Sequence, residues 1–199
     1  MKIRILVLWL ALAAPLASAQ ESLKPVKARA AERAAMLEAL QKGKEIDGSR
    51  GQYRHLPGVQ AVARGNETPQ EAIARMGAGA DQLLETKGRL VLFRSARRSA
   101  ASVEGVGGSS VYPVVLNART GTFGVLTGTL VVKPKSMTDA AAVANSHGLE
   151  TVKEYPQLQT VFYRVKANMD IADVAAALRA DPRVETAYPE IIEYVRTPK

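Results

Sequence analysis

The sequence of 199 residues contains no cysteine and only two histidines. Without cysteine, a disulfide framework, a thiolate nucleophile and a cysteine zinc site are all excluded. A Ser-His-Asp triad needs a histidine held between the serine and the acid, and only His55 and His147 are available. Neither has a second histidine at metal-ligand spacing. The sequence therefore predicts a protein without catalytic activity, cofactor or metal site.

Long hydrophobic runs are missing after the first residues of the chain. Lys2 and Arg4 precede an apolar run over residues 5–16, and small residues at 17–19 offer a cleavage site. The run is too short to remain in a bilayer as a spanning helix. The pattern predicts a secretory signal peptide, and we expect an exported protein, either periplasmic or secreted, with no membrane association after cleavage.

Positive charge exceeds negative charge mainly in the first half of the chain. Residues 21–110 carry fifteen Lys and Arg against ten Asp and Glu, whereas residues 111–199 carry ten against nine. Arg94, Arg97 and Arg98 form a small basic cluster. Because aromatic residues make up only 5% of an exported chain, we expect no nucleic-acid binding. The cluster is either solvated or meets an acidic protein surface.

The clearest pattern lies in residues 124–199 and repeats a strand-helix-strand unit. The predicted strands cover residues 125–132, 149–155, 160–165 and 184–188, and the predicted helices cover 136–147 and 170–179. Ile171, Val174 and Leu178 form one apolar face of the second helix. Two such units predict an α+β fold with a ferredoxin-like, or split βαβ, domain. Its helices would cover one sheet face and leave the other open to a partner.

The region before this domain is smaller and mixes helix with strand. Its predicted elements are a helix over residues 24–42, a loop over 43–65, a helix opened by a capping box at Thr68 and Glu71, a strand over 89–94 and a loop over 97–110. A hairpin around residues 117–121 belongs either to this region or to the second sheet. The predicted divisions are a signal peptide 1–19, a basic mixed region 20–110, a domain 111–193 and an extended tail 194–199.

Four short runs resemble a known protein family. They are His147-Gly148-Leu149-Glu150, Tyr155-Pro156, the stretch Asp-Val-Ala-Ala-Ala-Leu-Arg-Ala-Asp-Pro-Arg-Val-Glu at 173–185, and Ala187-Tyr188-Pro189-Glu190. These runs resemble the propeptides of subtilisin-family serine proteases (peptidase inhibitor I9-like domains), which also occur as free-standing inhibitors. A signal peptide and an extra amino-terminal region without a protease domain are similar to the external chaperones of secreted, kexin-like bacterial serine proteases. The resemblance implies a heterodimer with a subtilisin- or kexin-like protease, which the chain helps to fold and temporarily inhibits.

The resemblance also implies that the tail lies in the protease's substrate cleft as a cleaved product does. The residues concerned are Tyr194, Val195, Arg196, Thr197, Pro198 and Lys199. Such a tail binds as an added strand, and Pro198 is compatible if it faces away from the pairing edge. Either Lys199 or Arg196 would fill the first specificity pocket, which then needs an acidic wall. The alternative is a frayed terminus.

In the propeptides, acidic side chains near the last strand cap the amino ends of two protease helices. Glu190 matches one of these positions. Tyr188 stands where the second acid is expected, and Glu193 is the candidate to replace it.

Two other functions stay open, namely an inhibitor of proteases that fold alone and a periplasmic module that binds an acidic ligand.

Overall fold

The computed structural model describes residues 43–106, 109–167 and 169–193. Three predictions therefore fall outside the described residues, namely the signal peptide, the helix over 24–42 and the contacts of the tail 194–199. Within the described ranges, no helix is both long and apolar enough to cross a membrane.

The described elements all belong to residues 39–199, the second of two compact units of the chain. They form a mixed α+β fold made mostly of antiparallel strands. In chain order they are β1 (Glu45–Gly48), β2 (Gly51–Ala63), α2 (Pro69–Ala74), the 3-10 turn η1 (Ala80–Gln82), β3 (Leu83–Lys87), β4 (Leu90–Arg94), β5 (Glu104–Val106), β6 (Ser109–Asn117), β7 (Phe123–Pro134), η2 (Met137–Asp139), α3 (Ala140–His147), β8 (Glu150–Tyr155), η3 (Pro156–Leu158), β9 (Thr160–Arg164), α4 (Ile171–Ala180) and β10 (Val184–Ile192).

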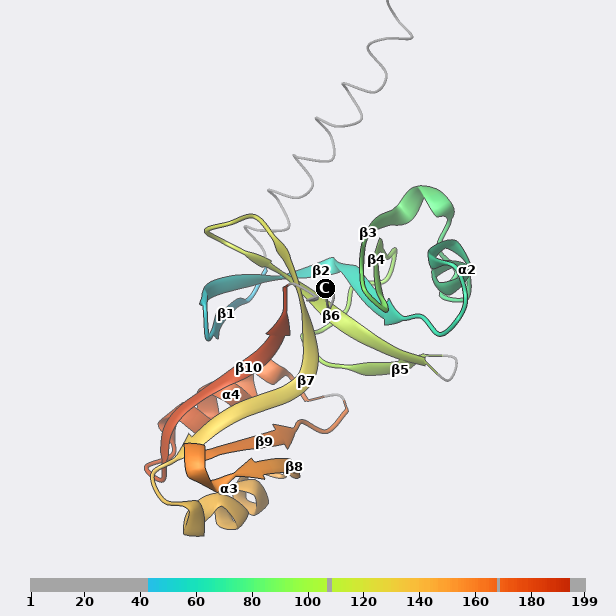
Figure 1. The fold of residues 1–199 in the computed structure, drawn as a ribbon. Coiled ribbons are helices and arrows are strands. Elements are labelled where there is room, and N and C mark those ends of the chain that lie inside the picture. Colours follow the sequence, from blue (N-terminus) through green and yellow to red (C-terminus); the bar gives the residue numbers. More distant parts are fainter. Residues whose placement is uncertain (1–42, 107–108, 168, 194–199) are drawn as a thin grey trace, which may run out of the picture. The chain divides into compact units, whose positions relative to one another are not determined.

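The strands of the described part join one ten-stranded antiparallel sheet (Figure 1). Its main path runs β3-β4-β2-β6-β7-β9-β8, and β1, β10 and β5 pair with β2, β7 and β6, respectively. Strand β6 pairs with β2 on one side and with β7 on the other. The predicted hairpin is confirmed, and through it the sheet crosses the predicted boundary at residue 111. The division into domains stays a prediction.

The strands and helices predicted after residue 124 are found, with shifted ends. The helix predicted over residues 136–147 is split into the 3-10 turn η2 and α3, and the Ser136 hydroxyl accepts the Thr138 N–H (3.3 Å) at the start of η2. Helix α4 begins where the Asp170 carboxylate accepts the N–H groups of Ala172 (2.9 Å) and Asp173 (3.2 Å). Strand β10 covers the strand predicted over 184–188 and continues to Ile192, into the extended run that the sequence predicts after it.

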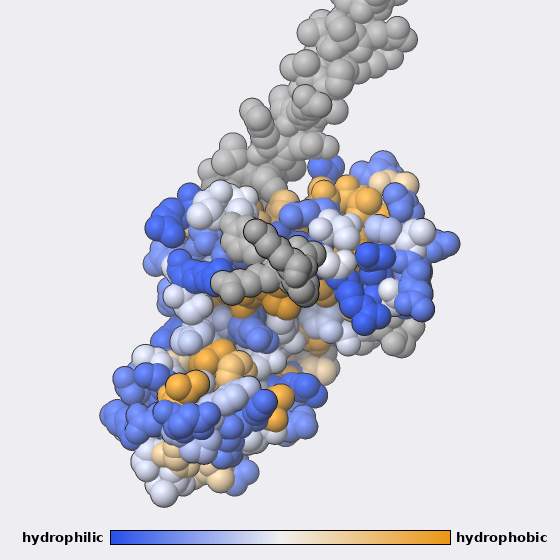
Figure 2. Space-filling model, in the orientation of Figure 1, coloured by the Kyte–Doolittle hydropathy of each residue, from blue (hydrophilic) through white to orange (hydrophobic). Residues whose placement is uncertain are grey.

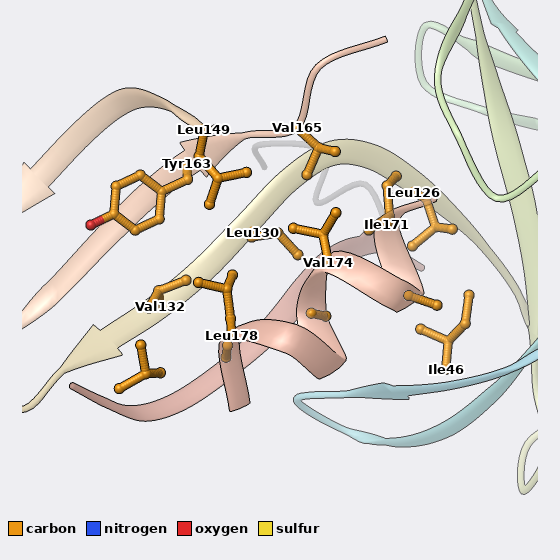
Figure 3. Close-up of a cluster of buried hydrophobic side chains, with 14 of the residues drawn as sticks. Ile46, Leu126, Leu130, Val132, Leu149, Tyr163, Val165, Ile171, Val174 and Leu178 are labelled. Atoms are coloured by element: carbon orange, nitrogen blue, oxygen red, sulfur yellow. The ribbon is translucent and has the colours of Figure 1, made fainter. Parts of the chain in front are cut away.

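The core of this half lies between the sheet and the two helices α3 and α4. Leu130 and Val132 of β7 and Leu178 of α4 belong to one buried cluster, and each has 0% exposure. In Figure 3, Leu178 extends from α4 toward Val132. The hydroxyl of Tyr163 in β9 donates to the carbonyl of Ala140 (2.8 Å), which ties the sheet to the start of α3. Both helices therefore cover the same face of strands β7 to β10.

The loop predicted over residues 43–65 is wrong, because this stretch forms both β1 and β2. The many polar residues of this stretch interrupt the alternation of apolar and polar residues that is typical of a strand. Ile46, Tyr53 and Leu56 are nevertheless 2% exposed or less. Strand β2 pairs with both β4 and β6, and its register with β6 shifts between His55 and Gln60. Backbone pairing on two sides stabilises an extended conformation that the local sequence does not favour.

The other predictions for this half are partly correct. Helix α2 has the predicted capping box, in which Thr68 accepts the Glu71 N–H (3.3 Å) and Glu71 accepts the Thr68 N–H (2.7 Å). Strand β4 matches the strand predicted over 89–94. The loop predicted over 97–110 is wrong in part, since it contains β5, which pairs with β6.

Candidate functional site

A row of half-buried side chains crosses the sheet on the face opposite α3 and α4. Val131 of β7 is the cross-strand partner of both Tyr188 in β10 and Phe162 in β9. Successive residues of a strand point to opposite faces. The neighbours of Val131, Leu130 and Val132, are buried in the helix-covered core. Tyr188, Val131 and Phe162 therefore point away from the helices, and we call them the apolar row.

Aromatic contacts extend the apolar row toward the edge strand β8. The Tyr155 ring meets Phe162 edge to face, with ring centroids 5.6 Å apart. The Lys153 ammonium lies 4.8 Å from the centroid of the Tyr155 ring. Val152 and Leu158 nearby are 46% and 61% exposed. Figure 2 shows hydrophobic patches among charged residues over this part of the chain. Apolar and aromatic side chains grouped in this way are typical of a protein-binding surface.

Charged residues border the apolar row. Lys133 and Arg164 are exposed and lie on the same sheet face, two positions from Val131 and Phe162 along their strands. Glu190 is half-buried, and its Oε2 accepts a hydrogen bond from the Thr127 hydroxyl (2.6 Å). Glu190, one of the two predicted helix-capping acids, therefore lies at the margin of the apolar row.

Glu193, the other predicted capping acid, lies inside the protein. Its side chain is 5% exposed, and its Oε1 accepts hydrogen bonds from Asn117 Nδ2 (2.9 Å) and the Thr122 hydroxyl (3.3 Å). Its backbone carbonyl accepts a hydrogen bond from Lys87 Nζ (2.9 Å). A carboxylate with these internal partners is poorly placed to cap a helix of another protein. The sequence did not indicate this cluster, because its members are far apart along the chain.

His147 lies in the last turn of α3, as predicted, but its ring contacts a carboxylate. Its Nε2 lies 2.9 Å from Asp181 Oδ2. Arg183 also binds Asp181 through Nε (2.9 Å) and Nη2 (2.6 Å). The hydrogen bonds from Arg183 hold the pKa of Asp181 far below its ordinary value. The Asp-Pro-Arg segment of the family-like stretch thus fastens α3, α4 and β10 to one another.

His55, predicted in a loop without a partner, lies in β2 and is 4% exposed. Its Nε2 is buried and has no hydrogen-bond partner. Burial lowers the pKa of His55 to about 4, against a weaker opposing influence of Asp170. The Nε2 atom of His55 therefore has neither a nucleophile nor an acid within hydrogen-bond distance.

The basic cluster lines a cleft of about 320 Å³ beside β4. Arg94, Arg97 and Arg98 contribute to its wall together with Phe93 and Glu104. The side chain of Arg94 has an interaction partner within the protein. The structure thus groups these arginines as the sequence suggested, with an acidic residue among them. In the described ranges, no three His, Asp or Glu residues gather closely enough to hold a metal ion.

Comparison with known proteins identifies a family for the chain. The model of the family described as the open reading frame 2 N-terminal domain matches residues 19–198, so the chain belongs to this family. One solved structure that the chain resembles is described as a complex of the Aeromonas sobria serine protease (ASP) with its chaperone (ORF2). The identity is 22%, the TM-score is 0.37, and the match covers 49% of this chain and all of the other chain. No curated protein matches the sequence.

Proposed function

We propose that this chain is a chaperone that acts in trans on a separate serine protease of the subtilisin or kexin-like type. It helps the protease to fold and inhibits it within a heterodimer. The observation that carries the proposal is the apolar row, which crosses three strands without a covering element among the described residues. The resemblance of residues 147–190 to protease propeptides and membership of the open reading frame 2 family support the choice of partner.

The apolar row supplies the docking surface in this proposal. Tyr188, Val131 and Phe162 offer the aromatic and aliphatic contacts that usually carry most of the binding energy at an interface. Two protease helices would pack across the row, with Glu190 at the amino end of one of them. A carboxylate is favoured there by the unpaired N–H groups and the helix dipole. The burial of Glu193 leaves Glu190 as the single capping acid in this scheme.

The tail supplies the inhibitory contact. Residues 194–199 would enter the substrate cleft as an added strand, with Lys199 or Arg196 in the first specificity pocket. An acidic wall in that pocket would suit a protease that cleaves after basic residues. Because the cleft would be occupied by a product-like segment, the protein inhibits without any catalytic group of its own.

Chaperone and inhibitor activity follow from one interface. A ligand that binds the native protease but not its unfolded chain stabilises the native state by about 4 kcal/mol at a thousandfold excess over Kd. If the same surface also binds the nearly folded protease, it lowers the folding barrier. The surface that favours the native fold also covers the active site, so release of the chaperone activates the protease.

The order of elements in the second half of the chain bears on the proposed fold, and the first residues bear on the proposed location. Residues 123–192 have the element order β-α-β-β-α-β and the strand order β10-β7-β9-β8, which supports the predicted ferredoxin-like, propeptide-like (I9-like) assignment. The signal-like pattern over residues 1–19 supports export to the periplasm, where an exported protease would fold. Detection of the protein in a periplasmic extract would test the location directly.

A refolding experiment tests the function. An exported subtilisin-like protease of the same bacterium, produced without any propeptide, is refolded alone, with the purified protein, and with a variant lacking residues 194–199. We expect activity to be recovered only after the protein is added and then removed. A protease that folds alone and is merely inhibited would indicate a plain inhibitor. If no exported serine protease of the host is folded or inhibited, the proposal is wrong.

A further inference from the structure

The last described residue, Glu193, is held by side chains from the half of the protein that precedes β7. Lys87, at the end of β3, donates from Nζ to the Glu193 backbone carbonyl (2.9 Å). Asn117, at the end of β6, donates from Nδ2 to Glu193 Oε1 (2.9 Å). Thr122, in the turn before β7, donates to the same oxygen (3.3 Å). We call these three donors and Glu193 the exit clamp, because residues 194–199 follow Glu193 directly.

Asn117, Lys87 and Glu193 of the exit clamp are buried and Thr122 is half-buried, so the hydrogen bonds among the buried members are costly to break. Asn117 and Glu193 are 3% and 6% exposed, and the Lys87 side chain is 8% exposed. The Lys87 ammonium also binds Glu85 (2.9 Å), so its charge is balanced. Burial and the nearby Glu193 carboxylate raise the pKa of the Tyr53 hydroxyl. A buried polar group that loses its partner keeps its desolvation cost, so each donor has a strong effect on the position of Glu193.

Two features show that the clamp is fitted to this end of β10. Asn117 is fixed by its own turn, since its Oδ1 accepts the N–H groups of Arg119 (3.0 Å) and Thr120 (3.1 Å). Gly124 of β7 has no side chain where β10 passes, and a Cβ there would lie 2.5 Å from Ile191 Cγ2 and 3.6 Å from Glu193 Cγ. Asn117 is thus held by contacts other than those with Glu193, and the backbone of β7 leaves room for the Glu193 side chain.

We infer that the half of the protein before β7 positions the tail, and that Lys87 and Asn117, with a smaller contribution from Thr122, are the positioning residues. The clamp fixes both the carbonyl and the carboxylate of Glu193, and thereby the point and direction at which the chain leaves β10. A tail that starts from a fixed point loses less conformational entropy when it enters a protease cleft. This inference rests on the proposed function, and it gives a role to the region outside the propeptide-like units.

The positioning can be measured without a protease. Because the chain has no cysteine, Val195→Cys provides a single site for a nitroxide label just beyond the clamp, and the exposed Leu158→Cys provides a remote control. We expect Lys87→Met and the milder Thr122→Val to increase the mobility of the label at 195 and to leave the label at 158 unchanged. Unchanged spectra at 195 with either variant, or equal changes at both sites, would overturn the inference.

A second measurement links the clamp to inhibition. Lys87→Met is compared with the parent for inhibition of the subtilisin-like protease used above, both in the full chain and after removal of residues 194–199. We expect Lys87→Met to weaken inhibition about tenfold in the full chain, and to have no effect once the tail is absent. An equal loss in both backgrounds would show a structural role for Lys87 and would contradict the inference. If removal of the tail does not change inhibition, the proposed function fails, whereas the label experiment still decides the positioning.

Discussion

The imidazole Nε2 of His147 lies 2.9 Å from Asp181 Oδ2 and joins the end of α3 to the residue that follows α4. Arg183 binds the same carboxylate, so one acid connects both helices to the start of β10. Asp181 and Arg183 therefore have a structural role. They keep α3 and α4 packed on the face of the sheet that lies opposite the apolar row.

The first prediction concerns acid stability. Because the folded-state pKa of Asp181 is depressed, its stabilising effect is present above the ordinary carboxyl pKa of about 4 and is lost as the pH falls below that value. Asp181→Asn should lower the Tm at pH 7 and reduce the dependence of Tm on pH below 4. Thermal unfolding between pH 2 and 7 tests this. If the Tm of Asp181→Asn falls below pH 4 as steeply as the Tm of the parent protein, the prediction is wrong.

His55 predicts a second, separate pH effect. Its pKa is lowered from 6.5 to about 4, so the unfolded chain binds more protons than the folded protein between these pH values. The free energy of unfolding should therefore decrease by up to roughly 3 kcal/mol as the pH falls from 6.5 to 4. Urea titrations across this window measure the change. His55→Leu should flatten the dependence, whatever its effect on absolute stability, and an unchanged slope would show that His55 is not responsible.

The third prediction tests the core between α4 and the sheet. Leu178 has 0% exposure and packs within the cluster that contains Leu130 and Val132. Leu178→Ala should reduce the free energy of unfolding by about 2–5 kcal/mol, since the cavity is only partly refilled. Leu158 is 61% exposed, so Leu158→Ala should change it by less than about 0.5 kcal/mol. Equal effects of the two substitutions in urea denaturation would contradict this account of the core.

A fourth prediction addresses the apolar row. Val131 lies at its centre, so Val131→Lys should place a charge in the proposed interface and weaken protease binding by about tenfold or more. Ala141 is exposed on α3, in the helix layer that covers the other face, and Ala141→Lys is the matched control. Titration of the inhibited protease with each variant gives the affinity. If the two variants bind equally well, the docking surface lies elsewhere.

The register of the tail gives the fifth prediction. With Lys199 in the first specificity pocket, Lys199→Gln should weaken inhibition about tenfold or more, because the acidic wall would lose its charged partner. Arg196→Gln should then have a smaller effect. The opposite order would assign the pocket to Arg196. Equal, small effects of both would contradict insertion of the tail into a basic-specific pocket.

The family-like runs and the short-range signals were enough to predict much of the second half of the chain. The apolar spacing of Ile171, Val174 and Leu178 indicated α4, and the capping box of Thr68 and Glu71 indicated α2. Each of these signals involves residues within about two helical turns of one another, so it can be recognised from the local sequence alone. The same reasoning indicated an uncovered sheet face, although not which side chains line it.

Only the tertiary structure decided where the remaining residues of the site lie. Strand β2 exists because β4 and β6 pair with it, and its own sequence resembles a loop. Glu193 meets Asn117 and Lys87, which are 76 and 106 positions away in the chain. Such contacts leave no periodic pattern, because they depend on how the strands are ordered in the sheet. The local sequence thus determined the helices and the last strands. Long-range pairing of the strands buried Glu193 and brought it into contact with residues of the first half of the protein, directly before the tail.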